Sequence, residues 1–349
     1  MGLRLRNTLA AWGLIALGVA VYALSPFNQV QMATVHALGG WVFSGRDALL
    51  AAALLYALAV ALVAWRQADA GPSKSLRALG VLVRALRAPA ATWREGLLAD
   101  DRVAVLTTLL KLFFAPLMVT SLTGFSMAAW ANGQALWAQA GQAPWTLLFD
   151  RHGFWFLMQA ILFVDVACFT LGYLVETPRL GNVIRSVDPS WLGWAVTLAC
   201  YPPFNAVTSR IVGSPVSDFP RFDDPTVHLA LNLALLALMA LYTWASLALG
   251  WKASNLTHRG IVARGPYAWV RHPAYTCKNL AWWIGAVPLV LASFQQGTGT
   301  GLVAAGSMAA WSFLYVLRAL TEEDHLRRVD GDYAAYAARV RHRFIPGVV

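Results

Sequence analysis

Residues whose side chains could bind or transform a small charged molecule are concentrated near the end of the chain. The stretch RGPYAWVRHPAY, residues 264–275, combines Arg271, His272 and Tyr275 with two prolines and a glycine. A second stretch, TEEDHLRRVDGDYAAYAARVRHRFIP, occupies residues 321–346 and adds acidic, phenolic and guanidinium groups. Cationic and acidic side chains form the strongest hydrogen bonds to charged ligands. The two stretches are therefore the first candidates for a binding or catalytic site.

A pair of apolar segments must position these two stretches. Residues 279–294 and 301–318 flank the short turn QQGTGTG. Two helices joined by so short a turn form a hairpin, so we expect the two polar stretches to meet at one face of a membrane. Tyr333 and Tyr336, three positions apart, also predict a C-terminal helix that lies along that face.

The composition is that of a polytopic membrane protein. Of 349 residues, 58% are hydrophobic and 13% are charged, whereas a soluble domain has about 25% charged residues. The apolar runs are continuous rather than alternating, which favours helices over a barrel. We predict an all-α membrane helix bundle of about eight spans, at residues 8–24, 47–65, 104–129, 154–175, 191–212, 227–250, 279–294 and 301–318.

The distribution of lysine and arginine predicts the orientation of these spans. If the N-terminus is cytoplasmic, 22 of the 27 lysines and arginines fall in inner segments and 4 in outer segments, as the positive-inside rule requires. Both termini are then cytoplasmic. The net charge of +10 is therefore a topology signal, and nucleic acid is not expected as a partner. The excess of arginine over lysine is typical of a GC-rich bacterial genome, which indicates a bacterial inner membrane.

We divide the chain into two regions. Residues 226–349 carry the chemistry described above, whereas residues 1–225 form a membrane region whose role the sequence does not indicate. Within the first region, the loop 66–103 predicts a basic amphipathic helix. Its apolar residues face the acyl boundary, and its opposite face carries Lys74, Arg77, Arg84 and Arg87.

Several other features of the spans and cysteines bear on function. The three cysteines have no paired spacing, so neither a disulfide framework nor a metal site is predicted. Lys111 and Asp165 lie inside spans, which indicates a proton or substrate path, a structural Lys–Asp pair, or a protonated aspartate with a helix neighbour. The two prolines of CYPPFN, residues 200–205, predict a kink or break in the fifth span.

The motifs of the C-terminal region have a recognisable order. Gly-Pro-Tyr is followed by Arg-His-Pro-x-Tyr, a hairpin, a Glu-Glu pair, Tyr-x-x-Tyr and a closing Ile-Pro. The residues are Gly265, Pro266, Tyr267, Arg271, His272, Pro273, Tyr275, Glu322, Glu323, Tyr333, Tyr336, Ile345 and Pro346. This set resembles the integral-membrane isoprenylcysteine carboxyl methyltransferases and phospholipid N-methyltransferases, over residues 255–346.

The resemblance implies S-adenosylmethionine as methyl donor and a cofactor pocket built from the loop, the glutamates and the tail. Arg271 or His272 would hold the donor's carboxylate, and Glu322 or Glu323 its ammonium or ribose hydroxyls. The expected cofactor-binding residues are Gly265, Tyr267, Arg271, His272, Pro273, Tyr275, Glu322, Glu323, Tyr333 and Tyr336.

The methyl acceptor stays open among a carboxylate, a thiol and an amine. Methyl transfer is a direct displacement that depends on alignment and exclusion of water. Arg343 or Arg341 would orient a carboxylate, whereas His272 or a glutamate would serve as base for a thiol or an amine. The acceptor is expected to be a lipidic or small amphiphilic molecule, and membrane lipids are the expected partners.

Two other functions compete with methyl transfer. Membrane sterol reductases share a related Arg-x-Pro-x-Tyr loop and use NADPH, but the Glu-Glu pair and Lys278 favour the methyltransferases. A non-enzymatic transporter or adaptor would instead use Lys111, Asp165 and the proline break. This sequence departs from the family pattern at Cys277 and Lys278, and its tail before Pro346 is about one residue longer.

Overall fold

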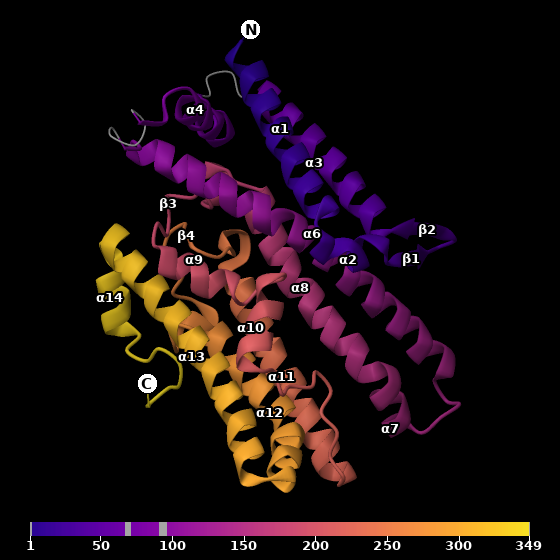
Figure 1. Cartoon of the computed structure of the whole chain (residues 1–349). Helices are drawn as coiled ribbons and strands as arrows, with labels where there is room; N and C mark the ends of the chain where they lie inside the picture. Colours follow the sequence, from indigo (N-terminus) through magenta and orange to yellow (C-terminus); the bar gives the residue numbers. More distant parts are fainter. Residues whose placement is uncertain (1, 67–70, 91–95, 349) are drawn as a thin grey trace.

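The computed structural model describes residues 2–66, 71–90 and 96–348, and it is built almost wholly from α-helices. The predicted all-α bundle is therefore confirmed (Figure 1). Two short antiparallel ribbons interrupt it, β1 (Val35–Leu38) with β2 (Trp41–Ser44), and β3 (Ser186–Val187) with β4 (Thr257–His258). The second ribbon joins the two halves of the chain.

Seven helical segments among the described residues are long and apolar enough to cross a membrane. They are α1 (Leu3–Leu24), α3 (Gly45–Arg66), α6 (Ala99–Gln139), α7 (Trp145–Leu148) continuing into α8 (Phe154–Leu174), α11 (Pro225–Leu249), α12 (Pro273–Gln296) and α13 (Thr298–Val329). The protein is thus a multi-pass membrane protein, as its composition predicts.

The predicted fifth span, 191–212, is wrong as a continuous helix. It is divided into α9 (Trp191–Leu198) and α10 (Phe204–Val212), each only about 12–14 Å long at 1.5 Å per residue. The break lies at Pro202 and Pro203, where proline removes a backbone donor and clashes with the preceding turn. The predicted break is therefore confirmed, and it is the physical reason why the span is not formed.

The broken segment nevertheless runs from one end of the bundle to the other. Before it, Asp188 follows β3, which pairs with β4 near the C-terminal end of α8. After it, the ring of Phe219 lies 4.5 Å from that of Phe154, at the opposite end of α8. This passage replaces the missing eighth helix, so α1 begins and α13 ends at the same end of the molecule (Figure 1).

The predicted amphipathic helix is present as α4 (Lys74–Arg87), with the Ser73 side chain as its N-cap. The remainder of the predicted segment 66–103 includes residues 67–70 and 91–95, which lie outside the described residues. Several basic side chains of α4 contact acids of the protein. Arg84 pairs with Asp101 at the start of α6, and Lys74 pairs with Glu176 just after α8. The helix is therefore held against the bundle by charge as well as by its apolar face.

The two charged residues inside predicted spans do not pair with each other. Lys111 Nζ lies 3.2 Å from Glu176 Oε2. Asp165 accepts hydrogen bonds from the hydroxyls of Tyr242, at 2.8 Å, and of Ser246. The Lys–Asp pair considered from the sequence is wrong, because each residue has its own partner.

The hairpin predicted from the sequence is confirmed. α12 and α13 are joined at Gly297 and pack along each other, and α11 packs on α12. α13 continues for about three turns beyond the predicted end of its span at residue 318. This extension carries Glu322 and Glu323 past the membrane segment, to the level of the loop that precedes α12.

Candidate active site

The loop between α11 and α12 is fixed by a glycine that no other residue could replace without strain. Gly265 has φ +58°, in the left-handed region, and a Cβ there would lie 3.2 Å from the Cβ of Ala248. Arg264 Nε also donates to the Ala248 carbonyl, at 3.2 Å. The loop therefore lies close against the end of α11 before Pro273 starts α12.

Arg271 in this loop is bound on two sides. Its Nε donates to Glu323 Oε1 at 2.8 Å, and its Nη1 donates to the carbonyls of Val340 and Arg341, both at 2.7 Å. Arg271 is 8% exposed and Glu323 is fully buried. One guanidinium thus joins the loop, α13 and the C-terminal tail.

Glu323 is the centre of a larger cluster of charges. Besides Arg271, its carboxylate lies 3.2 Å from His272 Nε2, 2.8 Å from Arg327 Nη2 and 3.2 Å from Arg343 Nε. A buried carboxylate is stable only when it is paired and hydrogen-bonded. The cluster satisfies that requirement and holds three segments of the chain together.

The tail completes the loop through its backbone. The backbone N–H groups of Arg271 and His272 donate to the carbonyls of His342 and Arg343, at 3.0 and 2.9 Å. Thr276 Oγ1 donates to the carbonyl of Phe344 at 3.0 Å. The tail therefore contacts the loop through backbone acceptors, in addition to the ion pair of the Arg343 side chain with Glu323.

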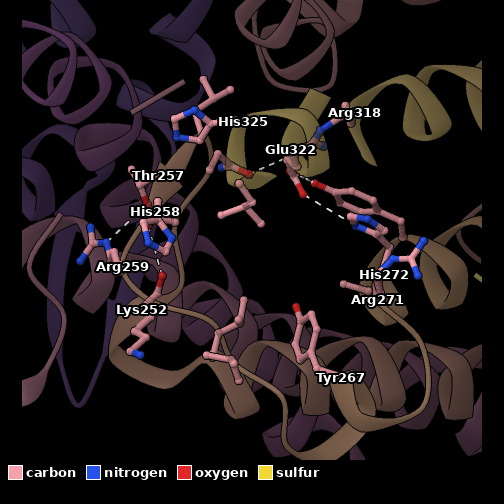
Figure 2. A pocket seen from close by; sticks show the side chains of 18 of the residues that line it. Lys252, Thr257, His258, Arg259, Tyr267, Arg271, His272, Arg318, Glu322 and His325 are labelled. Carbon is pink, nitrogen blue, oxygen red and sulfur yellow. Dashed lines mark hydrogen bonds and ion pairs between the residues drawn. The ribbon is translucent and has the colours of Figure 1, made fainter. Parts of the chain in front are cut away.

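Glu322, next to the buried Glu323, has a different environment. It accepts a hydrogen bond from the Tyr275 hydroxyl, and its Oε2 lies 3.8 Å from His272 Nδ1. The rings of His272 and Tyr275 stack at 5.6 Å with an interplanar angle of 6°. Figure 2 shows Glu322, His272 and Tyr267 around the open centre of a cavity, with Lys252, His258 and His325 on the other side.

This cavity has two chemically different parts. The part next to the loop is lined by Lys252, Thr257, His258, Glu322, His325 and Tyr333. The other part lies among residues of α11, α12 and α13 and of the segment between α9 and α10. It is lined by Tyr201, Tyr242, Ser246, Lys278, Tyr315 and Arg318. The cavity therefore joins a polar opening to an inner chamber of tyrosines and cations.

Most of the site residues predicted from the sequence meet at this cavity. Those that line it are Tyr267, Arg271, His272, Tyr275, Glu322, Tyr333 and Tyr336. The others that were predicted lie behind its wall: Gly265, Pro273, Glu323, Arg341 and Arg343. Gly265 shapes the loop and Pro273 begins α12, whereas Arg343 binds Glu323 and the Arg341 side chain is exposed.

Other lining residues were missed by the sequence analysis. They are Asp188, Tyr201, Lys252, His258, Arg318 and His325, together with further residues of α8, α11 and α12. A signal existed for Arg318, because positions 318 and 322 are four residues apart and so share one face of a helix. No local signal existed for Asp188, which reaches the cavity through the pairing of β3 with β4.

Burial determines the protonation of the phenols and imidazole around the loop. Burial raises the pKa of Tyr336 to about 12 and also raises the pKa of Tyr267 and of Tyr333. These phenols are neutral donors, and Tyr336 donates to the Tyr267 carbonyl at 2.9 Å. Burial lowers the pKa of His258, although Asp330 lies 2.9 Å from its Nε2 and acts in the opposite direction.

Together, fold and site define a multi-pass membrane protein in which a cavity lined by charged and aromatic side chains extends into the helix bundle. One end of the cavity carries both acidic and basic side chains, and the other end carries aromatic and basic side chains. A protein of this kind is suited to bring a soluble, charged donor to an acceptor that is dissolved in the bilayer.

Comparison with known proteins gives the family of this region. Residues 227–328 match the model of the isoprenylcysteine carboxyl methyltransferase (ICMT) family. No curated protein and no solved structure matches the chain. The family consists of integral-membrane enzymes that use S-adenosylmethionine as methyl donor, so the matched region indicates a methyltransferase that uses this donor. The matched residues include the loop and both glutamates.

The residues of the cavity fit this cofactor. Glu322 and Asp188 are carboxylates for an ammonium group, Lys252 and Arg271 are cations for a carboxylate, and the tyrosines give flat faces for a purine. In the described part of the chain, Asp188 Oδ2 and Arg318 Nε are buried without a hydrogen-bond partner. Orphaned polar atoms at a cavity are typical of a site that a polar ligand completes.

Proposed function

We propose that the protein transfers a methyl group from S-adenosylmethionine to the carboxylate of a lipidic or amphiphilic acceptor. The donor would bind next to the loop, between Glu322, Arg271 and the tyrosines of the tail. The acceptor would enter the inner chamber from the bilayer. When bound, S-adenosylmethionine supplies an electrophilic methyl group on a sulfonium centre.

The charges of the inner chamber are the reason for proposing a carboxylate as the methyl acceptor. Lys278 Nζ lies 5.1 Å from the ring centroid of Trp282 and 5.8 Å from that of Tyr242. Among the described residues, no carboxylate is within ion-pair distance of Lys278 or Arg318. The carboxylate whose charge acts on Lys278 is Asp165, which is bonded to the hydroxyls of Tyr242 and Ser246. Two cations that are not in contact with an acid, beside one such carboxylate, favour an anionic ligand. This charge imbalance is the observation that supports the proposal.

A carboxylate acceptor also makes the fewest demands on the protein. It is already deprotonated at neutral pH, so no base is needed and catalysis consists of alignment and exclusion of water. Lys278 and Arg318 would orient the acceptor, and Glu322 with His272 and Tyr275 would hold the donor. Arg341 and Arg343, considered for this role from the sequence, lie outside the cavity.

The proposed reaction takes place at the cytoplasmic face of a bacterial inner membrane. The start of α1, α4 and the end of α13 lie at the same end of the bundle (Figure 1), and positive charge accumulates on the cytoplasmic side. The region before residue 226 would be part of the catalytic unit, because Tyr201 and Asp188 contribute to the cavity wall.

A radiolabel experiment tests the proposal. Purified protein is incubated with a bacterial lipid extract and S-adenosylmethionine labelled in its methyl group. A methyl ester releases volatile labelled methanol in base, whereas a thioether or an N-methyl group does not. We expect base-labile label in the organic phase. Base-stable label would refute the carboxylate acceptor, and absence of S-adenosylmethionine binding by calorimetry would refute the use of this site.

A further inference from the structure

A second cavity lies in the N-terminal region, apart from the methyltransferase cavity. It is lined by α1, α3, α6 and the ends of α4 and α8. Its walls on α6 are Thr108, Lys111, Leu112, Ala115, Pro116 and Val119. These positions follow the spacing of one helix face. Because they extend over eleven residues, the hollow is about 16 Å long in the direction of α6.

The other two main helices contribute matching faces. α1 lines the cavity with Ala11, Leu14, Ile15, Gly18 and Val19, and α3 with Leu49, Ala52, Ala53, Tyr56 and Val60. The opposite face of α3 is strongly exposed, with Leu54 at 72% and Leu55 at 69%. The two faces of α3 thus have different surroundings. One is turned to lipid, and the other is turned to an internal hollow.

The cavity is amphiphilic along its length. The end of the cavity near Val119 is apolar on α6, where Leu112, Ala115, Pro116 and Val119 follow one another. The other end holds Lys111, Thr108 and Ser75, next to the interfacial helix α4. A lysine inside a membrane helix is costly unless it faces a partner or a polar ligand. The position of Lys111 therefore gives the cavity a head end and a tail end.

Positive charge exceeds negative charge at the head end. Lys74 and Lys111 share the single carboxylate of Glu176. Arg259 adds a third cation nearby, and its Nη atoms donate to the carbonyls of Gly172 and Asn182, at 2.7 and 2.9 Å, rather than to an acid. Lys111 has three N–H donors, and Glu176 occupies one. An anionic head group would find both charge and free donors there.

We infer that this cavity binds a single-chain, monoanionic amphiphile of the fatty-acid type, with its head at Lys111 and its alkyl chain between α1, α3 and α6. The apolar walls accept the chain, the length of the hollow suits a medium or long chain, and the excess charge selects an anion over a neutral lipid. This site is separate from the methyltransferase cavity and does not depend on which acceptor that cavity takes.

Native mass spectrometry of the full-length protein in neutral detergent tests the inference. The probes are palmitate, hexadecanol and phosphatidylglycerol. We expect one saturable palmitate per protein, with palmitate preferred to hexadecanol. Lys111→Met should weaken palmitate binding about tenfold, because a charge-assisted hydrogen bond is lost, and should leave hexadecanol binding unchanged. Equal loss of both ligands, or no loss, would overturn the role of Lys111.

A matched pair of substitutions on α3 tests the location. Ala53 lines the cavity, whereas Ala51 on the same helix is exposed to lipid. Ala53→Phe should abolish palmitate binding, and Ala51→Phe should preserve it. Equal binding by the two variants would refute the location. If Ala53→Phe does not fold, Ala115→Phe on α6 replaces it, with Leu109→Phe on the exposed face as its control.

Two further outcomes are decisive. Palmitate carrying a diazirine at its methyl end should label the unmodified protein at Val119 after irradiation, and label on the exposed face of α3 alone would refute the inference. Phosphatidylglycerol that binds in a manner sensitive to Ala53→Phe, when palmitate does not bind, would show that a two-chain phospholipid is the occupant and would overturn the single-chain assignment.

Discussion

Arg271 and Glu323 form a buried ion pair, with Nε and Oε1 2.8 Å apart, at the point where the loop, α13 and the tail meet. The neighbouring Glu322 points to the cavity instead. Two adjacent carboxylates of one helix therefore have different surroundings. The first faces the cavity, and the second joins the segments that surround it.

This difference predicts that two isosteric substitutions reduce the free energy of unfolding by different amounts. Glu323→Gln leaves Arg271 without its counter-charge, so we expect the free energy of unfolding to fall by about 3–5 kcal/mol. Glu322→Gln should reduce it by about 1 kcal/mol or less, because the Tyr275 hydroxyl can still bond to the amide. Chemical unfolding in detergent measures both values. Similar losses of stability in the two variants would contradict this prediction.

The same pair of variants separates ligand binding from stability. Glu322→Gln should weaken S-adenosylmethionine binding about tenfold, since a charge-assisted bond to the ligand is lost. Calorimetric titration at a temperature well below unfolding gives the affinity. Binding as tight as in the unmodified protein would remove Glu322 from the cofactor site.

Lys278 should affect the acceptor and leave the donor unchanged. Lys278→Met removes a chamber cation and retains the apolar stem that packs among aromatic rings. We expect the KM for the acceptor to rise about tenfold, with no change in S-adenosylmethionine affinity. Lys278→Arg keeps the charge and should restore most of the activity. A loss of donor binding in Lys278→Met would show that this residue belongs to the cofactor half of the cavity.

The C-terminal tail should be indispensable only up to a defined residue. A chain ending at Arg339 lacks the carbonyls of residues 340–344 that accept from Arg271, His272 and Thr276. We expect it to lose S-adenosylmethionine binding, because the loop loses its backbone acceptors. A chain ending at Pro346 retains all of them and should bind normally. Normal binding by the shorter chain would contradict the role of the tail.

The lowered pKa of Glu176 predicts how acid affects the stability of the N-terminal region. Burial raises its pKa, but Lys111 and Lys74 act more strongly together and lower it from 4.5 to about 2. Because the pKa in the folded protein is below that of the unfolded chain, the stabilisation is complete above pH 4.5 and is lost as the pH falls toward 2. At neutral pH it amounts to about 3 kcal/mol.

Unfolding of Glu176→Gln against pH tests this assignment. The variant should be less stable than the unmodified protein at neutral pH, and the difference should disappear as the pH falls through the range below 4.5. A difference that stays constant with pH would mean that the Glu176 side chain stabilises the protein by packing and not by its charge.

Hydropathy and motif order were sufficient to predict much of the C-terminal half. The hairpin of α12 and α13, and the meeting of Arg271 with Glu323, follow from two apolar segments and a short turn. The extension of α13 beyond residue 318 was not predicted, because a hydropathy window ends where charges begin although the helix continues. The prediction of a continuous fifth span was wrong for a local reason, because Pro202 and Pro203 separate α9 from α10.

The rest of the site depends on contacts between distant parts of the chain. Asp188 and Tyr201 reach the cavity only because β3 pairs with β4, some seventy residues away along the chain. A two-residue strand has no periodicity from which pairing could be predicted. Similarly, the partner of Lys111 proved to be Glu176, which lies outside every predicted span. Pairing of charges across helices is a property of packing, which one sequence does not encode locally.

The way in which the tail holds the loop has a consequence for variation among relatives. Its contacts to Arg271, His272 and Thr276 use main-chain carbonyls, which every amino acid possesses. Substitutions at positions 341 and 342 should therefore be widely tolerated, whereas deleting a single residue there would shift the acceptors out of register. Selection at this end of the protein would then act on spacing more than on residue type.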